Sequence, residues 1–335
     1  MNASDHLTVA DGGAVRDGSP RSRRGGSLMP QRWTLHGLNN GLIFSATYHG
    51  VGVLPRAVSY AIGDAGTWLA WRLMRRTREA IADNLRAIFP DQREEALERR
   101  ALLTFRAYAR DVIDFIRAIR APEDERRLAF DFPLEARQRF QAAHAEGRGV
   151  ILVTGHYGNW EIGSLIMRRT LRLPLTIVAM AEASPVVNRI RHDMRRATGA
   201  DTIEVRQSLD TALQIKRRLN EKCVVAMLAD RHLGRDRVRV TLLGRDAWFL
   251  RTPALMGLLT GAPLMPCFIE RTGTGRFEVS SGTAIHVSTE LPRDQAIGDA
   301  AQRIADQLGE HARLHPQYWY HFYRYWDAQR DAPAG

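Results

Sequence analysis

The sequence predicts an α/β fold in which a largely parallel central sheet is flanked by helices. After residue 140, short apolar runs alternate with helical segments such as "SLDTALQIKRRLNEK" at 208–222. Runs that are apolar throughout indicate strands buried on both faces, as in parallel sheets. The Gly-rich "IERTGTGRFEVSSG" at 269–282 adds a β-hairpin. The apolar runs are "GVILV" at 149–153, "LTIVAM" at 175–180, "CVVAMLA" at 223–229 and "LMPCFI" at 264–269.

Helical layers are expected before the sheet. Residues 1–30 are rich in Gly, Ser, Arg and Asp and lack the apolar segment of a signal peptide, so we expect a disordered basic tail. Residues 31–76 are apolar but are interrupted by Pro55 and Asp64. Because a spanning helix needs about 20 apolar residues, we predict two shorter, membrane-associating helices that break near Pro55. The Trp- and Arg-rich end of this stretch suits a bilayer interface, and a helix hairpin within the core is an equally good interpretation.

Two more helices precede the first apolar run. Residues 78–90 carry apolar side chains at helical spacing and end at a proline. A longer helix is expected over 92–119, with Asp91 as its N-cap. We expect residues 77–327 to form one domain that is followed by a disordered tail at 328–335.

The composition favours an anionic partner. Lys and Arg outnumber Asp and Glu by 48 to 37, the formal net charge is +11, and Lys216 and Lys222 are the only lysines. Guanidinium groups stay charged and bind phosphate in a bidentate manner, so a phosphorylated substrate, an acyl carrier protein or a membrane surface fits this charge. The arginines are dispersed rather than interleaved with stacking aromatics, which argues against nucleic acid.

The cysteines and histidines predict neither a metal nor a cofactor. Cys223 and Cys267 lie inside apolar runs and have the character of small core residues in a reducing compartment. The histidines do not form a metal-ligand spacing with one another or with cysteine.

The segment "TGHYGNWE" at 154–161 carries the candidate chemistry, because it follows a buried strand at the edge where α/β sheets gather reactive groups. Gly155 and Gly158 permit a tight turn and the close approach of a ligand. Asn159 is a candidate N-cap for the helix that follows. His156 and Glu161 are expected to come within hydrogen-bond reach, so that the carboxylate fixes the imidazole tautomer and raises its basicity.

The motif contains neither serine nor cysteine. We therefore expect the histidine to activate a substrate hydroxyl rather than a protein nucleophile. Backbone N–H groups of residues 155–159 are candidate donors to an oxyanion.

Several segments together resemble the bacterial lipid A biosynthesis (late) acyltransferases of the lysophospholipid acyltransferase superfamily, over about residues 40–327. The most specific match is "TGHYGNWE", which has the His-x4-Asp/Glu pattern of the family in its glutamate form. Supporting matches are "NLRAIFP" at 84–90, "MLADRHLG" at 227–234, "LLGRDAWFLRTPALMGLLTGAPLMP" at 242–266 and "HPQYWYHFYRYW" at 315–326.

The resemblance implies a glycerolipid acyltransferase-like fold and transfer of a fatty acyl chain from a thioester to a lipid hydroxyl. The implied donor is acyl carrier protein or acyl-CoA, and the implied acceptor is a lipid A precursor or a related anionic glycolipid or phospholipid. By this resemblance His156 is the general base and Glu161 is its partner. The implied location is the cytoplasmic face of the inner membrane.

Further binding residues are expected around this motif. Asp230 and Arg231 follow another apolar run, and Arg251 belongs to the same Arg-rich segment. The family carries an arginine near 195–196, and we assign Arg196 to substrate binding although Arg195 fits the pattern equally well. Each single arginine is otherwise explained by a solvated salt bridge. With Gly155, Gly158 and Asn159, these four complete the expected binding set.

Other interpretations of the sequence remain open. "QYWYHFYRYW" at 317–326 suits core packing and an interfacial belt equally. The enzyme could instead use acyl-CoA to acylate a phosphatidylinositol mannoside, an ornithine lipid or a lysophospholipid. A non-enzymatic, basic membrane-binding or nucleic-acid-binding module is the third interpretation.

Overall fold

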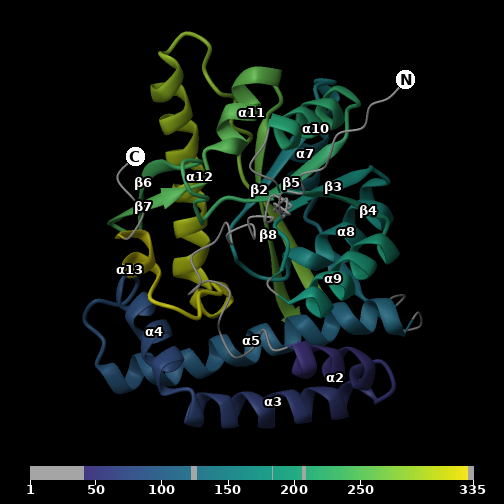
Figure 1. Cartoon of the computed structure of the whole chain (residues 1–335), viewed down its shortest axis with the longest axis vertical. Helices are drawn as coiled ribbons and strands as arrows, with labels where there is room; N and C mark the ends of the chain where they lie inside the picture. The colour runs from purple at the N-terminus through teal and green to yellow at the C-terminus, as the bar shows by residue number, and fades with distance from the viewer. Residues whose placement is uncertain (1–40, 122–126, 183, 206–208, 331–335) are drawn as a thin grey trace, which may run out of the picture.

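The computed structural model describes residues 41–121, 127–182, 184–205 and 209–330. The expected tail at 1–30 lies outside these ranges. A seven-stranded sheet forms the centre, with the order β1-β9-β8-β2-β5-β3-β4, and only the β8–β9 pair is antiparallel. The largely parallel sheet expected from the sequence is therefore confirmed (Figure 1). The strands are β1 (Ala129–Asp131), β2 (Val150–Thr154), β3 (Leu175–Ala179), β4 (Ala200–Glu204), β5 (Val224–Leu228), β8 (Leu264–Gly273) and β9 (Arg276–Ser281).

The four apolar runs correspond to β2, β3, β5 and β8, and the predicted hairpin is β8–β9. The strands β1 and β4 were not expected, because their sequences are short or mixed in polarity. The Arg-rich segment after β5 forms a separate antiparallel hairpin of β6 (Val238–Leu242) and β7 (Arg245–Phe249).

Helices cover both faces of the sheet (Figure 1). Alternate residues of β2 point to opposite faces: Ile151 and Val153 join one buried cluster, while Val150 and Leu152 join another. The first cluster includes helices α10 (Leu209–Asn220), α11 (Thr252–Thr260) and α12 (Arg293–Leu314). The second includes α7 (Leu134–Ala145) and the segment after α8 (Gly163–Ile166).

A layer of helices crosses the carboxyl ends of the strands (Figure 1). It consists of α2 (Gly41–Val51), α3 (Arg56–Leu73), α4 (Arg75–Arg86) and α5 (Glu94–Arg120). The predicted break near Pro55 is confirmed, since α2 and α3 are separated there. None of the helices within the described ranges is both long and apolar enough to cross a membrane.

The predicted start of the long helix was wrong. The long helix begins at Glu94 with Arg93 at the N-cap, because Asp91 lies in the turn that closes the preceding helix. Glu94 and Glu95 place negative charge in its first turn, where exposed N–H groups favour it. At the C-terminal end of the chain, α13 (Tyr325–Arg330) includes the first three residues of the expected tail at 328–335, and residues 331–335 lie outside the described ranges.

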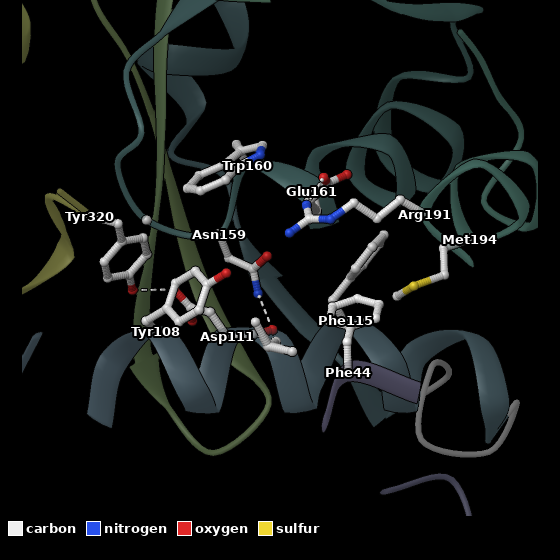
Figure 2. Close-up of a pocket in the computed structure, with 12 residues that line it drawn as sticks. Phe44, Tyr108, Asp111, Phe115, Asn159, Trp160, Glu161, Arg191, Met194 and Tyr320 are labelled. Atoms are coloured by element: carbon white, nitrogen blue, oxygen red, sulfur yellow. Dashed lines mark hydrogen bonds and ion pairs between the residues drawn. The ribbon is translucent and has the colours of Figure 1, made fainter. Parts of the chain in front are cut away.

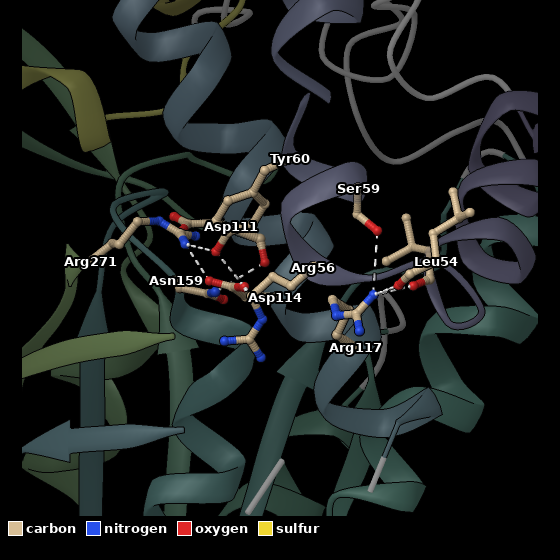
Figure 3. A network of polar contacts seen from close by, with 10 residues as sticks. Leu54, Arg56, Ser59, Tyr60, Asp111, Asp114, Arg117, Asn159 and Arg271 are labelled. Atoms are coloured by element: carbon tan, nitrogen blue, oxygen red, sulfur yellow. Dashed lines mark hydrogen bonds and ion pairs between the residues drawn. The ribbon is translucent and has the colours of Figure 1, made fainter. Parts of the chain in front are cut away.

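Buried ion pairs attach this helical layer to the sheet (Figure 3). Arg271, at the end of β8, forms ion pairs with Asp111 and Asp114 of α5 and donates a hydrogen bond to the Tyr60 hydroxyl of α3. The Tyr60 hydroxyl donates in turn to Asp114 over 2.6 Å. Nearby, Arg117 donates to the carbonyls of Val51 and Leu54, which satisfies the end of α2 before the chain turns into α3.

Candidate active site

The site forms where β2 and β5 end side by side. The register pairs Thr154 with Leu228, the last residues of these parallel strands. His156 and Asp230 each follow two residues later, so parallel pairing places them next to each other although they are 74 residues apart. Asp230 was expected near the site, and the structure places it there.

The partner of His156 is Asp230 and not Glu161. The His156 Nδ1 atom lies 2.7 Å from Asp230 Oδ1, and the backbone N–H of His156 donates to Asp230 Oδ2 over 2.8 Å. The Asp230 carboxyl is fully buried, while 15% of the His156 side chain is exposed. The second carboxylate oxygen also contacts Nε2 of His321 at 2.9 Å.

Electrostatics fix the tautomer of His156. Burial opposes ionisation of Asp230, but the two imidazoles outweigh it and hold the pKa of Asp230 well below its usual range. An ionised carboxylate only accepts hydrogen bonds, so Nδ1 of His156 carries the proton and Nε2 is left unprotonated. Burial and the nearby charge of Arg231 lower the pKa of His156, and together they outweigh Asp230, which raises it. His156 is therefore neutral at pH 7.

Glu161 pairs with two arginines of a later helix and not with His156, the partner that was expected. It accepts hydrogen bonds from Arg191 Nη1 at 3.0 Å and from Arg195 Nη2 at 2.8 Å, both from α9 (Pro185–Ala197). Figure 2 shows the carboxylate facing Arg191. The chain enters a 3-10 helix (Trp160–Ile162) directly after Asn159, and this turn directs Glu161 towards α9 rather than back to His156.

Of the two candidate arginines near 195–196, the structure brings Arg195 to the site. Its side chain is 12% exposed and lines the large cavity, whereas the Arg196 side chain is 74% exposed. The structure therefore favours Arg195 over Arg196 as the arginine that lines the cavity. Arg251 is also outside the cavity lining, because it pairs with Asp294 over 2.6 Å at the start of α11.

A cavity of about 730 Å³ opens beside His156. Its volume is in the range of ligand-binding pockets. Its lining includes apolar side chains that pack in one cluster, among them Leu152, Met167 and Ile177. Charged and polar side chains also line it: His156, Glu161, Arg191, Arg195, Arg231, His232, Arg235 and Asp236. Such a mixed lining suits a ligand that has both an apolar chain and an anionic group.

Neighbouring protein atoms, rather than a ligand, occupy the space beside the two glycines. A Cβ atom on Gly155 would lie 2.7 Å from Leu308 and 2.9 Å from Asp230 Oδ2. A Cβ atom on Gly158, whose φ is +60°, would lie 2.0 Å from the carbonyl oxygen of Ile269. Both glycines thus permit tight packing around the loop that carries His156.

Asn159 precedes a helical turn as expected, but its side chain does not cap it. Instead Nδ2 donates to the Asp111 carbonyl over 3.1 Å, which ties the loop to α5. The backbone N–H groups of His156, Gly158 and Asn159 donate to Asp230, Tyr318 and Ile269, respectively. These three N–H groups are therefore engaged and do not point to an oxyanion.

A second, smaller cavity of about 40 Å³ lies between the site and the helical layer (Figure 2). It shares Trp160, Glu161, Arg191 and Tyr320 with the large cavity. Its other side is apolar and comes from α2, α5 and α9, through Phe44, Val112, Phe115 and Met194.

The C-terminal aromatic segment is part of the core. The Tyr320 backbone N–H donates to the His156 carbonyl over 2.7 Å, and the Tyr320 hydroxyl donates to Asp111 over 2.6 Å. Of the two interpretations left open, core packing is the one the structure supports. The buried members are Tyr318, Trp319, Tyr320, His321, Phe322, Tyr325 and Trp326.

Sequence reasoning missed two residues of the site. Arg191 lies four residues before Arg195 on the same helix, and this i, i+4 spacing was a usable signal. His321 was noted only as one member of an aromatic segment. His156, Asp230 and His321 also bring three ligand atoms within 4.8 Å of one another, the one such group of three or more in the described part of the chain.

The sequence matches the family described as bacterial lipid A biosynthesis acyltransferase over residues 27–328. A similar protein is the phosphatidylinositol mannoside acyltransferase of Mycolicibacterium smegmatis, which is 25% identical over 309 residues, covering 89% of this chain and 94% of that protein. The phosphatidylinositol mannoside acyltransferase of Mycobacterium tuberculosis is 26% identical over 191 residues, covering 55% of this chain and 57% of that protein.

The pairing of Glu161 with two arginines predicts a pH-dependent loss of stability in Glu161→Gln. Burial opposes ionisation, but Arg195 and Arg191 outweigh it and lower the pKa of Glu161 from 4.5 to about 2. Such a group stabilises the folded state fully above its unfolded pKa, and this contribution disappears as the pH falls through about 2.

We expect Glu161→Gln to lower the free energy of unfolding at pH 7 by about 3 kcal/mol. Urea denaturation at pH 7 and pH 3 measures the difference between the two proteins, which should be smaller at pH 3. The exposed pair of His286 and Glu146 offers the control Glu146→Gln, for which little change is expected. A difference that is equal at both pH values would contradict the prediction.

Proposed function

We propose a reaction from one premise: this chain belongs to the bacterial lipid A biosynthesis acyltransferase family and is an acyltransferase. The proposed reaction moves a fatty acyl chain from a thioester donor to a sugar hydroxyl of a phosphate-bearing glycolipid. The observation that carries it is the neutral His156, held by Asp230 at a cavity lined by both apolar side chains and arginines.

In the proposed mechanism, His156 Nε2 takes the proton from the acceptor hydroxyl as its oxygen attacks the thioester carbonyl. The tetrahedral intermediate collapses as the carbon–sulfur bond breaks, and the imidazolium returns the proton to the leaving thiolate. Transfer is direct between the two substrates, since the loop around His156 contains neither serine nor cysteine. General-base assistance of this kind contributes about 10²- to 10⁴-fold.

Cationic side chains are proposed to stabilise the charges of the substrates. Arg231 lines the cavity, and its Nε is buried without a hydrogen-bond partner among the described residues. It is the proposed donor to the oxyanion, because a buried donor of this kind favours charge that develops in the transition state. Arg191 and Arg195, held by Glu161, are the proposed phosphate contacts.

Two acceptor classes compete. The family description names lipid A, whereas the relative matched over 89% of this chain is a phosphatidylinositol mannoside acyltransferase, which favours that second class. An acceptor with a sugar hydroxyl near phosphate would suit the histidine and the arginines that line the cavity. The proposed donor is an acyl carrier protein, which suits the net charge of +11, and acyl-CoA is the alternative.

We also propose that α3 rests on the cytoplasmic face of the inner membrane. α3 lies at the edge of the molecule, beyond α5 (Figure 1). Its outward stripe follows helical spacing and is exposed, with Trp68 at 52% and Leu73 at 74%. Arg72, Arg75 and Arg76 flank the stripe, which suits anionic lipid. The apolar members are Val58, Ile62, Trp68, Leu69 and Leu73.

The mechanism predicts that His156→Ala and Asp230→Asn each lower kcat by about 10²- to 10⁴-fold. The asparagine amide would donate a hydrogen bond to Nδ1. The imidazole proton would then lie on Nε2, which could no longer act as the base. In the unaltered enzyme, the acid limb of kcat/KM should lie below pH 6.5, because the pKa of His156 is lowered. Thioester turnover by purified protein measures both. His286→Ala, at an exposed histidine, is the control, and near-normal turnover by Asp230→Asn would refute the pairing.

The acceptor is testable by lipid mass spectrometry of a deletion strain. Loss of one acyl chain from phosphatidylinositol mannosides would support the class favoured by the relatives. Loss from lipid A would support the family description instead. If neither lipid changes while purified protein still turns over thioesters, the glycolipid proposal is wrong and ornithine lipids or lysophospholipids are the next acceptors to assay.

Membrane attachment predicts a specific loss of liposome binding. Replacing Trp68, Leu69 and Leu73 by serine should weaken binding to anionic vesicles by about tenfold or more, since each side chain loses its apolar contact. Co-sedimentation measures this. Leu134 and Leu259 are exposed on α7 and α11, so their serine variants provide a control matched in exposure. Equal binding by both sets of variants would exclude α3 as the contact.

A further inference from the structure

The Asp230 carboxylate has a second imidazole partner that the proposed mechanism does not use. His321 Nε2 lies 2.9 Å from Asp230 Oδ2, whereas His156 Nδ1 contacts the other oxygen, Oδ1. Both the His321 and Asp230 side chains are completely buried. One carboxylate therefore links two histidines, of which only His156 lines the cavity.

The direction of each hydrogen bond in this arrangement follows from chemistry. Ionised Asp230 only accepts, so Nε2 of His321 carries a proton and donates it. The other ring nitrogen, Nδ1, then accepts from the Tyr323 hydroxyl at 3.1 Å. Tyr323 thus donates to His321 and His321 donates to Asp230, while His156 donates to the same carboxylate through Nδ1 and its backbone N–H.

The surrounding residues hold His321 in place. Its ring contacts those of Trp319 and Tyr325, with centroids 4.8 Å and 4.5 Å away. The Asn84 side chain of α4 donates to the His321 carbonyl over 3.1 Å. The Tyr325 hydroxyl donates to the backbone carbonyl of Asp230 over 2.8 Å, which fixes the separation of the two segments.

His321 acts as a fixed neutral donor, not as a proton carrier. Burial lowers its pKa to about 3, although Asp230 acts in the opposite direction. At neutral pH it therefore offers one N–H dipole to Asp230 Oδ2. This donor withdraws part of the carboxylate charge from His156, and it also limits rotation of the carboxyl group.

We propose that His321 is a positioning residue of the acyl transfer, which keeps Asp230 oriented on His156 and moderates how strongly that carboxylate raises the basicity of His156. This inference rests on the proposed function, because it assigns His321 to the same general base. Without His321, the Asp230 charge would fall more fully on His156, while the carboxyl group would lose one of its anchors.

The test compares two variants of His321 in the full-length protein. His321→Gln keeps an N–H donor, and His321→Leu removes it. We expect His321→Leu to lower kcat by about 10- to 100-fold with little change in KM, and to move the acid limb of the pH profile to higher pH. His321→Gln should recover most of kcat and the position of the acid limb.

Tyr325→Phe is the control for a merely structural loss. It removes another buried hydrogen bond to residue 230 but leaves the carboxylate contacts intact, so it should lower thermal stability without moving the acid limb. The proposal is overturned if His321→Leu lowers thermal stability without changing kcat or the acid limb. It is also overturned if His321→Gln folds but has a kcat as low as that of His321→Leu.

An NMR titration of the His156 imidazole separates this proposal from the proposed function. Absence of turnover by the unaltered protein would defeat the function, whereas a His156 pKa that is unchanged by His321→Leu would defeat this inference. Inactivation by EDTA that Zn²⁺ reverses would also overturn it, because the three side chains would then be acting as metal ligands.

Discussion

The burial of an ionised carboxylate at Asp230 is the constraint around which the candidate site is organised. An unpaired buried charge is costly, and here the backbone N–H and Nδ1 of His156 and Nε2 of His321 offset that cost. These donors come from the end of β2 and from the C-terminal segment, while Asp230 itself follows β5. The site therefore exists only when three distant parts of the chain have come together.

Glu161 is a second buried and ionised carboxylate, but its charge is offset by other partners. These are guanidinium groups from α9 rather than imidazoles. Two carboxylates near one cavity thus have separate effects. One keeps a neutral histidine oriented, as the proposed base requires, and the other holds two cations in the cavity wall. This division gives the cavity a basic group and a positive region at the same time.

Much of the fold could be predicted because apolar runs report burial directly. The sequence could not reveal the partner of His156, since the nearest carboxylate along the chain is not the nearest in space. Because a single turn of 3-10 helix follows Asn159, the Glu161 side chain points towards α9. Helical geometry, by contrast, was informative about the arginines: Val187, Arg191 and Arg195 share one face, and Val187 is completely buried. Arg196 lies about 100° around the helix from Arg195.

The helices proposed to contact the membrane are joined to the same elements that carry the site. Arg271 links β8 to Asp111 and Asp114 of α5, and Tyr60 of α3 bonds to both Arg271 and Asp114. Asp111 also accepts from Tyr320, which lines both cavities. Removing one partner of such a buried pair costs about 3–5 kcal/mol, far more than an exposed ion pair contributes. The outward stripe of α3 and the base at His156 are therefore held in a fixed relative orientation, so docking α3 on lipid would also set how the cavity faces an acceptor in that lipid.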